Sequence, residues 1–116
     1  MNVRRALTLL FMITIATHAV SQVLDPDIEC AAYWQLKSVG LAQEYSIAAA
    51  IESEKYQQQY VAAKNTLTTH HGSADFTRQF YDSVKVMLAS VDNDLSNTVV
   101  LDEQYQERCT LETEAQ

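Results

Sequence analysis

The scarcity of helix-breaking residues constrains this chain more than any other feature. Its 116 residues include one proline, Pro26, and two glycines, Gly40 and Gly72. Proline and glycine are the two residues that most disfavour the interior of a helix. Each of the three stands where a helix could begin or end. The sequence therefore predicts an all-α protein whose helices are separated near these positions.

The first predicted helix begins at Asp25-Pro26, a capping residue followed by a first-turn proline. We expect this helix to stop or kink at Gly40. Its apolar face repeats every three or four residues and consists of Ile28, Ala32, Leu36 and Val39. A face of this kind predicts burial against other helices.

A longer amphipathic helix is predicted from Leu41 to about His70. One side of it carries Tyr45, Ala49, Tyr56, Tyr60, Ala63 and Leu67. Gly72 then suits the end of a helix, because glycine readily adopts the left-handed backbone conformation found there. Ser73 can cap the helix that follows.

Beyond Gly72 the apolar pattern continues as a further helix. Its stripe consists of Phe76, Phe80, Val84, Met87, Val91 and Leu95. The run Asp92-Asn93-Asp94 either lies within this helix or breaks it, and the sequence leaves both readings open. A last apolar series leads to the acidic tail and consists of Val99, Leu101, Tyr105 and Cys109.

Two architectures satisfy this helical pattern. The chain could fold back at Gly72 as one long helical hairpin. Alternatively, residues 92–94 form a true turn and give a small bundle of three or four antiparallel helices. We favour the bundle, because a bare two-helix hairpin would expose its aromatic stripe unless it dimerised. A monomer and a homodimer both remain open.

The N-terminal residues have the layout of a signal peptide. Two arginines precede an uncharged apolar run over residues 6–16, which is shorter than the ~20 residues that span a membrane. Small residues predict cleavage after Ser21, with Ala19 as the alternative. We therefore expect residues 1–21 to be removed. One domain, residues 22–116, is then left in the periplasm or outside the cell, without a transmembrane anchor.

The two cysteines lie near opposite ends of the predicted mature chain. Export to an oxidising compartment favours their pairing, so we expect a disulfide between Cys30 and Cys109. Closing a loop of this length stabilises the fold by about 4 kcal/mol in the loop-entropy model. The bond would also leave no free thiol for catalysis or metal binding.

The predicted mature chain is strongly acidic. It retains six basic and fifteen acidic side chains, a formal charge of −9. Nucleic acids and anionic membranes should repel such a protein, so we expect no nucleic-acid partner. Acidity alone does not distinguish a solvated surface from a surface that binds a basic partner.

Residues 92–103 resemble the calcium loop of an EF-hand. Oxygen-bearing side chains stand at loop positions 1, 3, 5 and 12, namely Asp92, Asp94, Ser96 and Glu103. However, Asn97 replaces the usual glycine, an apolar residue stands at the ninth position, and there is no second loop. We therefore favour no metal site and expect a joint between helices with Asp94 as an N-cap.

His70 and His71 are the two histidines of the predicted mature chain. Adjacent helical residues point about 100° apart, so the pair cannot chelate one metal from a regular helix. A position at the end of a helix is instead favoured by the helix dipole. Whether the pair senses pH is left open.

We expect no enzymatic activity, no catalytic residue and no cofactor. The sequence has no glycine-rich phosphate loop, no Gly-x-Ser-x-Gly and no His-Glu-x-x-His. Most aromatic residues are expected in the core. Tyr56 and Tyr60, beside three glutamines, could instead form an exposed strip that contacts a protein partner.

Three functions therefore follow as hypotheses. The first is a non-enzymatic protein-binding or inhibitory module that meets another exported or envelope protein. The second is a periplasmic stress protein similar in outline to acid-stress chaperones, to which size, helicity, acidity and the single disulfide point. The third is a calcium-binding helical protein that uses residues 92–103.

Overall fold

The computed structural model describes residues 24–111, and within this range it contains four helices and no strand. The helices are α2 (Pro26–Ala42), α3 (Ile47–His71), α4 (Ser73–Ser90) and α5 (Val99–Tyr105). The predicted all-α fold is confirmed. The predicted leader, residues 1–21, lies outside the described residues.

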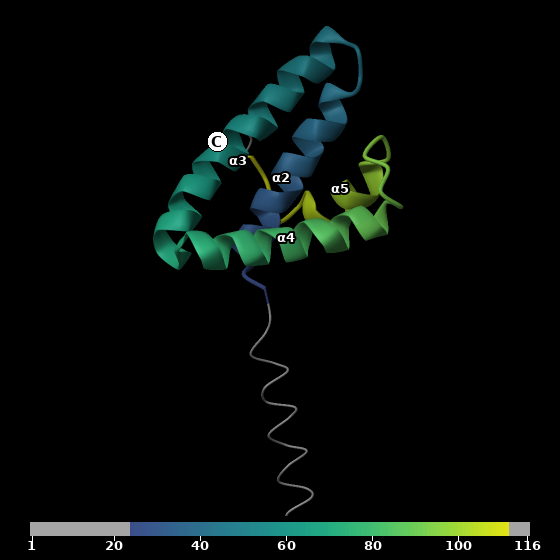
Figure 1. Cartoon of the computed structure of the whole chain (residues 1–116). Coiled ribbons are helices and arrows are strands. Elements are labelled where there is room, and N and C mark those ends of the chain that lie inside the picture. Colours follow the sequence, from purple (N-terminus) through teal and green to yellow (C-terminus); the bar gives the residue numbers. More distant parts are fainter. Residues whose placement is uncertain (1–23, 112–116) are drawn as a thin grey trace, which may run out of the picture.

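The helices form a small bundle with α2 at its centre (Figure 1). Helices α2 and α3 run antiparallel, lie close together near the turn that connects them, and spread apart towards their other ends. Helix α4 runs across this wide end and contacts both. Helix α5 packs against α2 and α4, and the last described residues return past α2 towards α3.

The start of α2 follows the prediction, but its end does not. Asp25 is the N-cap, and its side chain accepts a hydrogen bond from the backbone N–H of Asp27 at 2.8 Å. The predicted stop at Gly40 is wrong, because the helix continues to Ala42. A Cβ on Gly40 would lie 2.6 Å from the carbonyl oxygen of Leu95 and 2.8 Å from Cγ2 of Thr98. The glycine therefore allows the loop before α5 to approach α2 closely.

Helix α3 begins later than predicted, at Ile47. Ser46 caps it by accepting a hydrogen bond from the backbone N–H of Ala49. Tyr45 consequently belongs to the turn and is fully exposed, so its predicted place in the buried stripe is wrong. The rest of the stripe is confirmed as buried or half-buried: Ala49, Tyr56, Tyr60, Ala63 and Leu67.

Gly72 joins α3 to α4, as predicted. Its φ of 87° is a conformation that glycine tolerates, and its N–H donates to the carbonyl of Thr68. Ser73 is not the N-cap of α4 but its first residue. The cap is Gly72 itself, which has no side chain to donate or accept a hydrogen bond.

The helical conformation is interrupted after α4. This interruption decides between the two predicted architectures. Asp92 and Asn93 both adopt left-handed backbone conformations, with φ of 54° and 60°. These values interrupt a right-handed helix, so the long hairpin is excluded and the bundle is confirmed. Asp94 is not the N-cap of α5, because Thr98 holds that position. The Asp94 carboxylate instead accepts hydrogen bonds from the backbone N–H and the hydroxyl of Ser96.

The core has two parts that meet at the wide end of the bundle. The larger part surrounds Tyr33, Met87 and Leu101, and the smaller surrounds Ile28 and Phe76. The predicted disulfide between Cys30 and Cys109 is confirmed, with the two Cα atoms 5.3 Å apart. The indole N–H of Trp34 donates to the carbonyl of Cys109 at 2.8 Å. The disulfide thus fastens the C-terminal segment to the first half of α2.

Candidate functional site

The two tyrosines predicted to contact a partner have different environments. Tyr56 is 6% exposed and its ring meets that of Tyr33 edge-on, with centroids 6.3 Å apart. Its predicted place in an exposed strip is therefore wrong, because it lies on the side of α3 that faces α2. Tyr60 is half-buried, and its ring lies 5.6 Å from that of Phe80 on α4.

Tyr60 belongs to an aromatic series that runs from the core to the surface. Phe76 is 3% exposed and stacks on Phe80, with centroids 5.6 Å apart. The ring of Phe80 meets that of Tyr81 edge-on at 6.4 Å, and Tyr81 is 62% exposed. Helical spacing places Val84 and Leu88 on the same side of α4 as these rings. We call this surface the aromatic face: Tyr60, Phe80, Tyr81, Val84 and Leu88.

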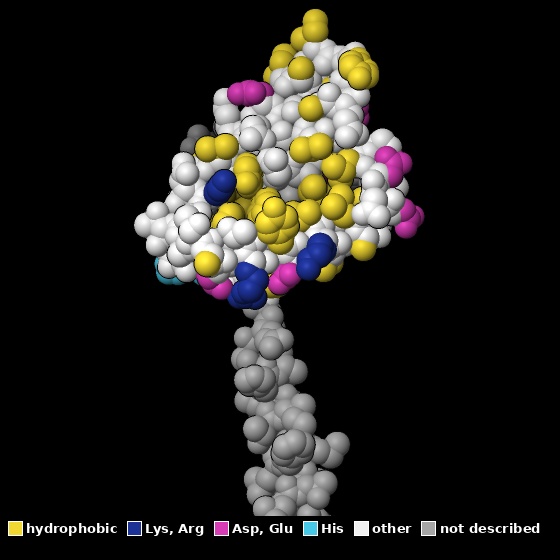
Figure 2. Space-filling view, in the orientation of Figure 1, with side chains coloured by type: hydrophobic (Ala, Val, Ile, Leu, Met, Phe, Trp, Pro, Cys, Tyr) yellow, Lys and Arg dark blue, Asp and Glu magenta, His cyan; other side chains and the backbone are white. Residues whose placement is uncertain are grey.

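Apolar side chains gather in the middle of one side of the molecule, over α3 and α4 and the space between them (Figure 2). Lys and Arg side chains border this apolar area, although the protein as a whole is acidic. Lys64 lies one helical turn after Tyr60, and Lys85 lies one turn after Tyr81. Lys85 pairs with Asp82 at 3.3 Å, whereas Lys64 forms no ion pair with any carboxylate in residues 24–111.

A second exposed apolar region lies at the turn between α2 and α3, at the top of Figure 2. We call it the hairpin tip: Tyr45, Ile47 and Ile51. These side chains are 104%, 82% and 55% exposed, respectively. Unlike the aromatic face, the tip is a protrusion and not a surface shared by two helices.

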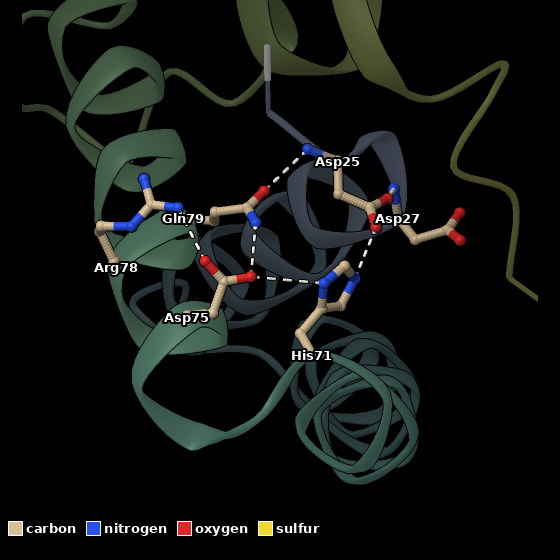
Figure 3. A network of polar contacts seen from close by, with 6 residues as sticks. All are labelled: Asp25, Asp27, His71, Asp75, Arg78 and Gln79. Carbon is tan, nitrogen blue, oxygen red and sulfur yellow. Dashed lines mark hydrogen bonds and ion pairs between the residues drawn. The ribbon is translucent and has the colours of Figure 1, made fainter. Parts of the chain in front are cut away.

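A polar network closes the corner where α2, α3 and α4 meet (Figure 3). The Nε2 atom of His71 lies 2.7 Å from Oδ2 of Asp25, and its Nδ1 atom lies 3.4 Å from Oδ2 of Asp75. Gln79 accepts a hydrogen bond from the backbone N–H of Asp25 and donates to Asp75. Arg78 donates to the other oxygen of Asp75 at 2.7 Å. One histidine thus connects the beginning of α2 to the beginning of α4.

The predicted position of the histidines in the last turn of a helix is confirmed. His70 is exposed, whereas the side chain of His71 is 18% exposed. The sequence pattern did not reveal that Asp25, 46 residues away, is a partner of His71. Arg78 lowers the pKa of the Asp75 carboxyl, aided by the hydrogen bond from Gln79 and the nearby His71.

A second network attaches α5 to α2. Lys37 forms an ion pair with Asp102 at 2.7 Å and donates to the hydroxyl of Thr98. Tyr33 donates to the other carboxylate oxygen of Asp102, also at 2.7 Å. Burial of Tyr33, and then its contact with this carboxylate, raises the pKa of the phenol far above its usual value. These contacts pair the polar groups of a partly buried joint between the two helices.

The four candidate calcium ligands do not form a cage. Asp94 is engaged by Ser96, and Glu103 lies on α5 with its side chain exposed. Within residues 24–111 no three acidic, histidine or cysteine side chains come close enough together to hold a metal ion. Calcium binding through Asp92, Asp94, Ser96 and Glu103 stays a prediction, one that this geometry does not favour.

No known protein-family model matches the chain, and neither a curated protein nor a solved structure shows significant similarity to it. None of the helices in the described part of the chain is both long enough and apolar enough to cross a bilayer. The disulfide fits a protein exported to an oxidising compartment.

Proposed function

We propose that this protein is a non-enzymatic binding module that contacts another exported or envelope protein through its aromatic face. The observation that carries the proposal is the position of Tyr81, which is 62% exposed at the end of a continuous series of aromatic contacts. Aromatic residues that are rigidly supported from below are typical centres of protein interfaces. Monomeric proteins rarely expose a contiguous apolar surface without using it.

The chemistry of the aromatic face indicates the kind of partner. The rings and aliphatic side chains come from two helices, so a partner helix could lay an apolar stripe between α3 and α4. Lys64 and Lys85 border the surface, and Lys64 forms no ion pair among the described residues. An amphipathic helix with acidic residues flanking its apolar stripe is therefore the partner we expect. The periplasm, where a disulfide persists, is the compartment we favour.

Substitution of Tyr81 tests this proposal. A photo-cross-linker at position 85 would first identify the partner in the exporting cell, and the affinity of that partner would then be measured by calorimetry. We expect Tyr81→Ala to weaken binding at least tenfold, as truncation of a central aromatic contact does. Tyr45→Ala at the hairpin tip is the matched control, because it also removes an exposed tyrosine and should leave the affinity unchanged.

Equal effects of the two substitutions would contradict the proposal. So would Tyr81→Ala binding as tightly as the wild type. Lys64→Glu provides a second test, because reversal of this charge should weaken binding of an acidic helix without touching the core. Circular dichroism spectra of all three variants should match the wild type, since each side chain is exposed.

The acid-stress hypothesis has one supporting observation, the carboxylates of the corner network. The pKa of Asp75 is lowered in the folded state. Its contribution to stability is therefore present above pH ~4, where the unfolded carboxyl is ionised, and disappears as pH falls through the lower folded pKa. Loss of the network below this lowered pKa would loosen the junction of three helices. Suppression of client aggregation at pH 3 but not at pH 7 is the result this hypothesis requires.

A further inference from the structure

A cleft lies beside α3, next to the C-terminal segment. It has a volume of about 310 Å³ and is bounded by α2, α3 and the C-terminal segment that contains Arg108 and Thr110. Ala62 and Thr66 line it from α3, whereas Lys64 borders the aromatic face. No residue of α4 lines the cleft, whereas four of the five residues of the aromatic face lie on α4, namely Phe80, Tyr81, Val84 and Leu88. The two surfaces are therefore separate.

The lining of the cleft combines apolar and polar residues. Trp34, Leu67 and the Cys30 half of the disulfide supply the apolar part. Asp27 and Arg108 are the charged residues of the lining. A concave apolar site with a few polar groups at its opening, of at least ~300 Å³, is typical of small-molecule binding.

The two charged residues of the lining differ in one respect: Arg108 already has an oppositely charged partner within residues 24–111, and Asp27 does not. Arg108 forms an ion pair with Glu29 at 2.8 Å and lies over the ring of Tyr105, 4.9 Å from its centroid. Asp27 points away from the corner network (Figure 3). Among the described residues, none donates a hydrogen bond to the Asp27 carboxylate, and none forms an ion pair with it. The charge left to attract a ligand is thus negative, in a protein that is acidic overall.

We propose that this cleft binds a small amphipathic amine, with its apolar body against Trp34 and its ammonium group paired with Asp27. An amine is favoured over a carboxylic acid because the cation of the lining is already matched by Glu29. The small side chains of Ala62 and Ala63 leave room on α3 for a ring or a short alkyl chain. This site is independent of the protein-binding function proposed above.

The single tryptophan of the chain lies in the cleft, which makes the proposal directly measurable. Fluorescence of Trp34 would be recorded during titration with 4-phenylbutylamine, 4-phenylbutanol and 4-phenylbutyrate. These probes share an apolar body and differ in the charge of the head group. We expect a saturable change with the amine, roughly threefold weaker binding of the alcohol, and the weakest binding of the acid.

Two substitutions locate the binding. Asp27→Asn should reduce the affinity of the amine to that of the alcohol and leave the alcohol unaffected. Ala62→Leu should fill part of the cleft and weaken all three probes. Ala50→Leu is its matched control, because Ala50 is an exposed alanine that helical geometry places on the opposite side of α3.

Several outcomes would overturn the proposal. One is the absence of a saturable change in Trp34 fluorescence with the amine. Another is equal affinity for amine, alcohol and acid, which would indicate an unselective apolar surface. A third is an amine affinity that neither Asp27→Asn nor Ala62→Leu reduces, because binding would then occur elsewhere on the molecule.

Discussion

The disulfide end of the bundle and the hairpin tip belong to the same pair of helices, yet they are held together differently. At the disulfide end, α2 is joined to the C-terminal segment by the Cys30–Cys109 bond, by the hydrogen bond from Trp34, and by the ion pair between Glu29 and Arg108. These contacts connect residues more than 70 positions apart in sequence. Tertiary contacts therefore fix this end.

Local contacts dominate at the hairpin tip. Ser46 caps α3, and Ser38 and Ser53 exchange hydrogen bonds between the two helices. The apolar side chains Ile47 and Ile51 face solvent. The apolar residues of this chain therefore do not contribute equally to stability. Removing contacts at the disulfide end should cost far more free energy of unfolding than removing larger side chains at the tip.

Loss of the disulfide should lower the free energy of unfolding more than any other change. Replacing Cys30 and Cys109 together by alanine is expected to lower the free energy of unfolding by about 4 kcal/mol, because the unfolded chain is no longer closed into a loop. Thermal unfolding followed by circular dichroism should show a midpoint lower by roughly 20 °C. The wild-type protein in reductant is the control and should behave like the double variant. A decrease of less than 5 °C would mean that the bundle does not depend on its disulfide.

Disruption of the corner network should cause the next largest decrease in the free energy of unfolding. His71→Ala removes a partly buried group that contacts Asp25 and Asp75, and should destabilise the protein by about 1–2 kcal/mol in urea unfolding. His70→Ala is a matched control on the neighbouring exposed residue, with an expected change below about 0.5 kcal/mol. Equal changes in both variants would show that His71 acts only through the helix dipole and not through its two carboxylates.

Tyr33 gives a smaller effect that depends on pH. Tyr33→Phe loses the hydrogen bond to Asp102, so we expect it to be less stable than the wild type by about 1 kcal/mol at pH 8. The pKa of Tyr33 is raised in the folded state, so its contribution is present below about pH 10 and is lost as pH rises and the unfolded phenol ionises.

The difference between wild type and Tyr33→Phe should consequently shrink towards zero at pH 10.5. Urea unfolding at both pH values measures it. Tyr45→Phe at the hairpin tip is the control and should follow the wild type at both. A difference that stays constant between pH 8 and pH 10.5 would contradict the assignment of this pH dependence to Tyr33.

The sequence predicted what depends on local pattern and on the two cysteines. Few helix breakers and a regular apolar spacing were enough to predict the helices, and export chemistry was enough to predict the disulfide. Errors arose where a distant residue decides the outcome. Gly40 lies inside α2, where the absence of a side chain leaves room for Leu95 and Thr98, and its position near a predicted helix end could not reveal those neighbours.

The candidate sites were harder to predict for the same reason. Tyr56 and Tyr60 lie on one stripe of α3, and only the placement of α2 and α4 separates a buried ring from a ring at the surface. The cleft is built from three segments whose proximity the sequence does not encode in any local pattern. The sequence predicted that most aromatic residues lie in the core, but it did not distinguish the buried Tyr56 from the exposed Tyr81.

The smallest change in the free energy of unfolding is expected at the hairpin tip. This expectation directly tests whether the tip and the disulfide end are held together differently. Replacing Ile47 and Ile51 together by serine removes two large apolar side chains, yet both are mostly exposed, so the free energy of unfolding should change by less than about 0.5 kcal/mol. Leu67→Ala is the reference at the other end of α3, where a buried leucine should cost about 2–5 kcal/mol. Urea unfolding of both variants makes the measurement. A loss above 1 kcal/mol from the two isoleucines would mean that the tip is held by apolar contacts, and the two ends of the bundle would then be alike.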